Sequence, residues 1–143
     1  MAITQALPNS FKKQLLDGDQ DFSSAGGDKF KLALYVSTAT LGASTTSYTT
    51  SGEVSASGDY VAGGKALVNT GTSVVSTVAF TDFSDLSFTG VTITARGALI
   101  YNTSFSNAAV AVLNFVTDKT ATDGTFTIQF PAFTSTAAII RIS

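Results

Sequence analysis

The stretch that decides the fold is KFKLALYV, residues 29–36. Phe30, Leu32, Leu34 and Val36 alternate with other residues, so they share one face of an extended chain. The same period of two recurs in VTITA, residues 91–95, and in TFTIQF, residues 125–130. Period-two alternation predicts strands with one face in a core and Thr-rich faces outside.

Further strands are expected around these three. The apolar or Val/Thr-rich stretches that predict them are residues 74–80, 83–88, 98–101, 109–116 and 139–142. Gly97 suggests a bulge or bend, and Asp123-Gly124 is a hairpin signal. Short strands with frequent turns predict an all-β fold, a single-domain antiparallel β-sandwich (jelly-roll-like or Ig-like) over residues 1–143.

Two segments stand outside this pattern. Residues 1–28 form an N-terminal arm with one short predicted helix, which Asn9 or Ser10 caps and Gly18 ends. Phe11, Leu15 and Leu16 fall at helical spacing and should dock on a larger body. Residues 37–64 are rich in Ser, Thr, Gly and Ala, and we interpret them as a long loop region with one or two short strands.

Composition excludes several kinds of chemistry. The chain has no His, Cys or Trp, one Glu, 22 Thr and 17 Ser among 143 residues. Without His or Cys there is no Ser-His-Asp relay, thiolate nucleophile, disulfide or ordinary transition-metal site. The charged fraction of 13% is about half the usual value of ~25%, and the net charge is −2. The sequence has no basic stripe of the kind that would predict nucleic-acid binding. It also has no apolar run that would predict a membrane helix or a signal peptide.

Two groups of carboxylates remain as candidate sites. Asp17, Asp19 and Asp21 alternate as in the start of an EF-hand loop, and Asp28 would be the twelfth position. However, Phe22 stands at the sixth position, where that loop needs Gly, so a solvated connector is the preferred interpretation. Asp82 and Asp85 could pair as in a glycosidase, although their context favours a turn between strands. We therefore expect no catalytic residue, cofactor or metal.

Six segments together span much of the chain: residues 1–18, 29–41, 60–67, 91–102, 126–131 and 138–143. Through these segments the chain resembles the small virion proteins of tailed bacteriophages. This resemblance implies a structural part of the particle and brings no catalytic residues with it.

From the residues and the resemblance together, we expect a non-enzymatic bacteriophage structural protein. The leading hypothesis is a capsid decoration or cement protein, located in the virion, that stabilises the head by bridging capsid subunits. Its partners would be the major capsid protein or other virion proteins, with self-association into a homo-oligomer and without nucleic acid or membrane. The alternatives are a tail, adaptor or fibre component and, in another class, a hydrolase that uses Asp82 and Asp85.

The expected contact regions are the N-terminal segment and the long loop. Both contain apolar or aromatic side chains without a complete periodic core pattern. Tyr35, opposite Phe30 and Leu32, and Tyr101 could line a contact surface or cover a sheet. The predicted contact residues are Ile3, Leu7, Phe11, Tyr48 and Tyr60.

Overall fold

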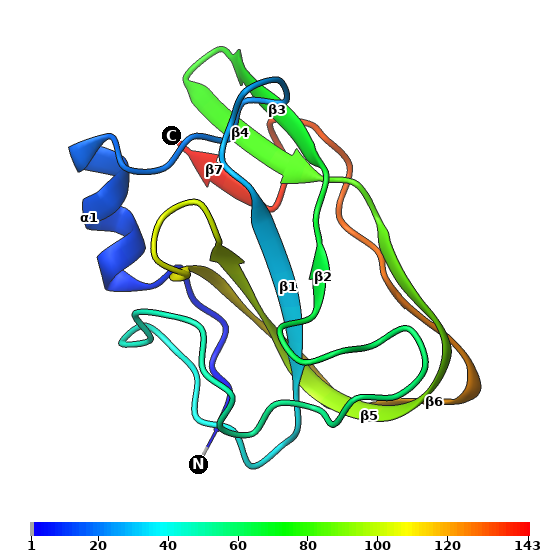
Figure 1. Cartoon of the computed structure of the whole chain (residues 1–143). Coiled ribbons are helices and arrows are strands. Elements are labelled where there is room, and N and C mark those ends of the chain that lie inside the picture. Colours follow the sequence, from blue (N-terminus) through cyan, green and yellow to red (C-terminus); the bar gives the residue numbers. More distant parts are fainter. Residues whose placement is uncertain (1) are drawn as a thin grey trace.

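Two antiparallel sheets build the protein, whose computed structural model describes residues 2–143 (Figure 1). The first sheet has the order β2-β1-β5-β6 and the second has the order β3-β4-β7. The prediction of an all-β, sandwich-like fold with a short N-terminal helix is confirmed. The elements are α1 (Asn9–Asp17), β1 (Phe30–Tyr35), β2 (Lys65–Ala66), β3 (Asn69–Val75), β4 (Val78–Phe83), β5 (Leu86–Asn102), β6 (Ala108–Ile128) and β7 (Ile140–Ile142).

Strand β1 is covered on both faces. Phe30, Leu32 and Leu34 point into the main core, where Phe30 packs edge-on against Phe83 of the second sheet at 5.5 Å between ring centroids. Ala33 and Tyr35 point the other way, into a second buried cluster. The alternation of residues 29–36 therefore separates two cores rather than a core from solvent.

The second cluster is closed by segments outside the sheets. Its members from the sheet are Ala33, Tyr35, Leu99, Tyr101, Ala109 and Val112, and its cover consists of Ile3, Ala39 and Leu41. The predicted loop region 37–64 runs along the sheet. Two backbone hydrogen bonds of 2.9 Å hold it there: Val54 N–H donates to Leu34 O of β1, and Val36 N–H, just after β1, donates to Gly52 O. This region is consequently a covering layer.

Strands β5 and β6 form one long, curved ribbon (Figure 1). The register shifts at several places along their pairing, one of them between Ala95 and Gly97, which confirms the predicted bulge. A Cβ at Gly97 would lie 2.5 Å from the Leu113 carbonyl oxygen, so only Gly fits there. The hairpin predicted at Asp123-Gly124 is wrong: β6 continues through both residues, and Asp123 adopts a positive φ of 46° next to a register shift.

The predicted strand at residues 74–80 is in fact two strands. Strand β3 ends at Val75, Ser76 turns with a φ of 54°, and β4 starts at Val78 opposite Val75. The turn contains no Gly, Asn or Pro, the residues that usually mark one, so the Val/Thr pattern continued through it.

The N-terminal arm pairs with the rest of the chain like a strand. Thr4 N–H donates to Leu41 O at 2.9 Å, and Ala6 and Val112 exchange two backbone hydrogen bonds. Pro8, not Asn9 or Ser10, is the N-cap of α1, whereas Gly18 ends it in the predicted left-handed conformation. The helix docks through Phe11, while Leu16 is 90% exposed, contrary to the prediction that it docks. No helix within residues 2–143 has the length and apolar character to cross a membrane.

The arm's role can be tested by truncating a buried side chain. We expect Ile3→Ala to lower the free energy of unfolding by about 2–4 kcal/mol, because Ile3 fills the second cluster. Urea denaturation monitored by circular dichroism would measure the change. The control is Thr4→Ala, an exposed neighbour expected to change stability by less than about 0.5 kcal/mol. Equal stability of both variants would contradict a structural role for Ile3.

Candidate functional site

A compact group of polar contacts surrounds Glu53, the single Glu of the chain. Glu53 Oε1 accepts a hydrogen bond from the Tyr48 hydroxyl at 2.6 Å. Its Oε2 accepts from the Tyr60 hydroxyl and from the Gly63 N–H, both at 2.7 Å. One carboxylate thus connects three points of the covering layer.

The other two tyrosines complete this group, which we call the Glu53 cluster: Tyr35, Tyr48, Glu53, Tyr60 and Tyr101. The Tyr35 hydroxyl donates to Thr49 O at 2.6 Å, and the Tyr101 hydroxyl donates to Gly63 O at 2.5 Å. The rings of Tyr48 and Tyr101 stack with centroids 4.7 Å apart. Because Tyr35 belongs to β1 and Tyr101 to β5, the cluster fastens the loop to the sheet.

The Tyr60 hydroxyl is used as both donor and acceptor. It donates to Glu53 and accepts a hydrogen bond from the buried Leu34 N–H of β1 at 2.8 Å. The Tyr60 ring is fully buried and lies 5.1 Å from that of Phe88. Every polar atom that this side chain brings into the core therefore has a partner.

Electrostatics in the cluster keep the phenols protonated. Burial, and then the charge of Glu53, raise the pKa of Tyr101 to about 12. Burial is also the first cause that raises the pKa values of Tyr35, Tyr48 and Tyr60 well above their usual range. At neutral pH the four hydroxyls are donors, not bases or nucleophiles. The cluster is thus equipped to hold the loop rather than to react.

The structure places the five predicted contact residues mostly inside the molecule. Ile3, Phe11 and Tyr60 are buried, and Leu7 and Tyr48 are half-buried. The three buried side chains are covered by the chain's own residues, and contact of the five residues with another protein stays a prediction. Sequence reasoning missed Glu53; the available signal was the chain's single Glu in a segment that contains Tyr48 and Tyr60 and only one other charged residue, Asp59.

The candidate carboxylates do not assemble into a site. Asp82 is buried and Asp85 is exposed, and Asp85 Oδ1 accepts from Phe130 N–H at 2.8 Å. Burial raises the pKa of Asp82, whose Oδ1 accepts from Phe83 N–H. Asp17 pairs with Lys13, and Asp28 accepts from Asn102. Within residues 2–143, no group of three or more Asp, Glu, His or Cys residues is placed to hold a metal ion.

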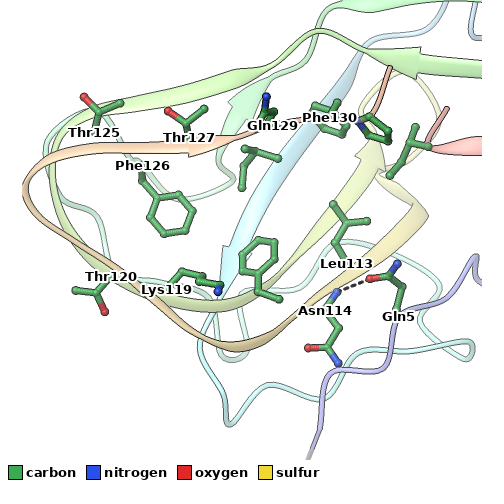
Figure 2. A pocket seen from close by; sticks show the side chains of 14 residues that line it. Gln5, Leu113, Asn114, Lys119, Thr120, Thr125, Phe126, Thr127, Gln129 and Phe130 are labelled. Atoms are coloured by element: carbon green, nitrogen blue, oxygen red, sulfur yellow. Dashed lines mark hydrogen bonds between the residues drawn. The ribbon is translucent and has the colours of Figure 1, made fainter. Parts of the chain in front are cut away.

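The largest cavity described here, about 580 Å³, lies inside the curve of β6 (Figure 2). Figure 2 shows Phe126 pointing into this space, while the hydroxyls of Thr125 and Thr127 point away from it. Gln5 of the N-terminal arm reaches its rim and accepts from Asn114 N–H at 3.0 Å. Lys119 is the one charged residue among those that line it, and no carboxylate is present to act as its partner in catalysis.

A second cavity of about 290 Å³ separates α1 from the three-stranded sheet β3-β4-β7, which we call the small sheet. We call this cavity the α1 groove. Its apolar walls come from Leu15 of α1, from Phe22, and from Ala79, Ile140 and Ile142 of the small sheet. Neither cavity contains Asp82 or Asp85, so neither brings a carboxylate pair to a cleft.

Removal of the Glu53 carboxylate should destabilise the whole covering layer. We expect Glu53→Ala to cost about 3 kcal/mol, because it leaves two hydroxyls and one N–H without their acceptor. Glu53→Gln should cost only about 1 kcal/mol, since its amide oxygen still accepts and its NH₂ can donate to a Tyr hydroxyl. Urea denaturation compares both with Ser55→Ala, an exposed change in the same loop. Equal midpoints for Glu53→Ala and Ser55→Ala would disprove this role.

The tyrosines should also determine the alkaline stability. A phenol whose pKa is raised by folding stabilises the native state fully below pH ~10, and this contribution is lost as pH rises through the native pKa. We expect the free energy of unfolding to fall only above pH ~10. Tyrosinate absorbance near 295 nm, undisturbed because Trp is absent, should rise together with unfolding. Tyrosine ionisation in the folded protein near pH 10 would contradict the buried cluster.

Comparison with known proteins finds no relative of this chain. No protein-family model matches the chain, and no curated protein or solved structure matches it either.

Proposed function

We propose that this chain is a non-enzymatic structural protein of a tailed-bacteriophage virion that decorates the capsid and bridges neighbouring capsid subunits. The resemblance that motivates the proposal extends over the N-terminal arm, α1, β1 and much of β5, which are segments that pack against one another. A likeness spread over such a framework concerns the whole fold rather than one local motif.

The observation that carries the proposal is the character of the exposed face of the small sheet. Val75 is 52% exposed and Phe133 is 40% exposed, and Phe133 packs edge-on against Phe80 at 5.1 Å. Val75 lies opposite Val78 at the end of the β3–β4 hairpin. Exposed apolar groups on one rigid face mark a surface suited to another protein. We call the following set the hairpin face: the exposed Val75 and Phe133, the half-buried Val78, and the buried Phe80 that packs against Phe133.

The charge distribution supports the same function. No charged residue occurs from Ala66 to Thr81, so the β3–β4 hairpin can meet another surface without desolvating an ion. Strand β3 is also an edge strand, which leaves its outer backbone groups open along part of its length. Modest contacts suffice when many copies bind a symmetric shell, because each copy that bridges two subunits gains from effective concentration.

The mechanism of stabilisation would be linkage. A protein that binds the assembled shell, and not its separated subunits, shifts the equilibrium toward assembly in proportion to its occupancy. The fastened covering layer matters here, because a rigid subunit loses less conformational entropy when it binds. The Glu53 cluster would thereby contribute to binding without touching the partner.

The test is to locate the protein on particles and then alter the hairpin face. We expect density maps of particles to show many copies distributed over the head, and heads that lack the protein to lose their contents at lower temperature. Val75→Asp should abolish co-sedimentation with such heads, whereas Val116→Asp, at a still more exposed Val on β6, should leave it intact. A few copies confined to the tail would overturn the decoration role in favour of a tail, adaptor or fibre component.

A further inference from the structure

The cavity inside the curve of β6 has the size of a small-molecule site. Its volume of about 580 Å³ falls within the range of cavities that hold such ligands, roughly 300–1,000 Å³. Two limbs of β6 face each other across it, residues 113–120 on one side and residues 125–128 on the other (Figure 2). Residues 129–131 extend the second wall, and Gln5 of the N-terminal arm lies at the rim. The cavity is therefore formed mainly by one strand that curves back on itself.

Each limb of β6 contributes an aromatic ring to the cavity. Phe126 belongs to the main core, and the half-buried Phe115 packs against that core. The centroids of the two rings are 6.3 Å apart, and their planes are tilted by 43°. Rings whose centroids are ~4.5–7 Å apart are already in contact, so no third ring fits between them. A ligand would therefore lie across the two rings, which favours a flat, apolar body.

One cation accompanies these apolar groups. Lys119 lies on the limb opposite Phe126, as Figure 2 shows. It is the single charged residue that lines the cavity, and none of the ion pairs formed within residues 2–143 includes it. The adjacent carboxylate, Asp118, already accepts a hydrogen bond from Arg96 Nε at 2.8 Å. The cavity thus presents a positive charge without a partner, and an anion would complement it.

A strained bulge shapes the wall that carries Phe115 and Lys119. The pairing of β5 with β6 shifts there, so that the four residues 115–118 stand opposite Arg96 alone. Within this bulge Val116 has a φ of 72°, which a β-branched residue rarely adopts. Bulges bend a strand and redirect its side chains, and backbone strain of this kind is concentrated at functional sites. The backbone itself therefore positions the ring and the cation on one wall.

We propose that this cavity binds a small organic anion, whose flat apolar body lies on Phe115 and Phe126 and whose carboxylate or sulfonate pairs with Lys119. The aromatic wall holds the body, and the lone cation determines the orientation of the charged end. A cationic ligand is disfavoured, because no carboxylate lines the cavity. This inference is independent of the virion function, because the cavity contains no residue of the hairpin face.

Fluorescence titration of the full chain with 8-anilinonaphthalene-1-sulfonate tests the proposal. This probe has a flat aromatic body and one negative charge, and N-phenyl-1-naphthylamine is its uncharged counterpart. We expect the wild type to bind the sulfonate probe saturably, with one probe per chain. Lys119→Ala should weaken this binding roughly threefold to fivefold, as expected for one ion pair in contact with solvent. The same substitution should leave the affinity for the uncharged probe unchanged.

Lys12→Ala is the matched control for the charge. Lys12 is an exposed lysine of α1 that lies outside the cavity, so its removal should change the affinity for neither probe. A wild type that shows no saturable binding of the sulfonate probe would overturn the proposal. Equal weakening by Lys119→Ala and Lys12→Ala, or an equal loss of affinity for both probes in Lys119→Ala, would overturn it as well.

An introduced Trp locates the bound probe. The chain has no Trp, so Phe115→Trp supplies a single indole, and the bound sulfonate probe should quench its emission strongly. Leu16→Trp, at an exposed residue of α1 outside the cavity, should be quenched much less. Backbone amide chemical shifts of the nitrogen-15-labelled wild type give the location without any substitution, and the probe should change them most within residues 113–131. Equal quenching of the two Trp variants, or the largest shifts elsewhere, would overturn the assigned site.

Discussion

The carboxylate of Glu53 is the interaction on which the covering layer depends. A loop of Ser, Thr, Gly and Ala has few apolar groups to hold it against a sheet, and its backbone polar groups need partners if it is to exclude water. Glu53 accepts from Tyr48, Tyr60 and Gly63 at once. Charge-assisted hydrogen bonds are the stronger kind, so a single ion can replace a larger apolar contact.

The covering layer in turn explains why β1 and part of β5 are apolar on both faces. With both faces shielded, β1 and the adjoining half of β5 can be apolar on both sides, as Ala33, Leu34, Leu99 and Ile100 are. Beyond the cover, the ribbon of β5 and β6 returns to alternation, with Thr94 and Thr120 paired across its exposed face at 3.0 Å. The Ser and Thr excess therefore has two uses, a loop layer and strand surfaces where β-branched side chains suit the pleat.

Much of the fold could be predicted from alternation, and the errors have local physical causes. The period of two located β1, the middle of β5 and the end of β6 correctly, although β5 and β6 each join segments that were predicted as separate short strands. The turn at Ser76 escaped notice because a Ser supplies the positive φ normally left to Gly. Asp123-Gly124 suggested a hairpin because the same residues suit a bulge as well as a turn. The Glu53 cluster could not be predicted, since it joins tyrosines from two strands and a loop by tertiary contact alone.

The exposed fraction of a side chain identifies candidate contact residues that sequence periodicity does not. Ile3, Phe11 and Tyr60 fall in irregular segments yet are buried, whereas Leu16 and Val75 fall in regular elements yet are exposed. In the small sheet, Ala79 lies opposite Ile142 in the row that lines the α1 groove, and the adjacent row holds Val75 and Val78. Successive residues of a strand point to opposite faces, so these rows lie on different sides. The two surfaces nevertheless meet at Phe80, which belongs to the hairpin face and also lines the α1 groove.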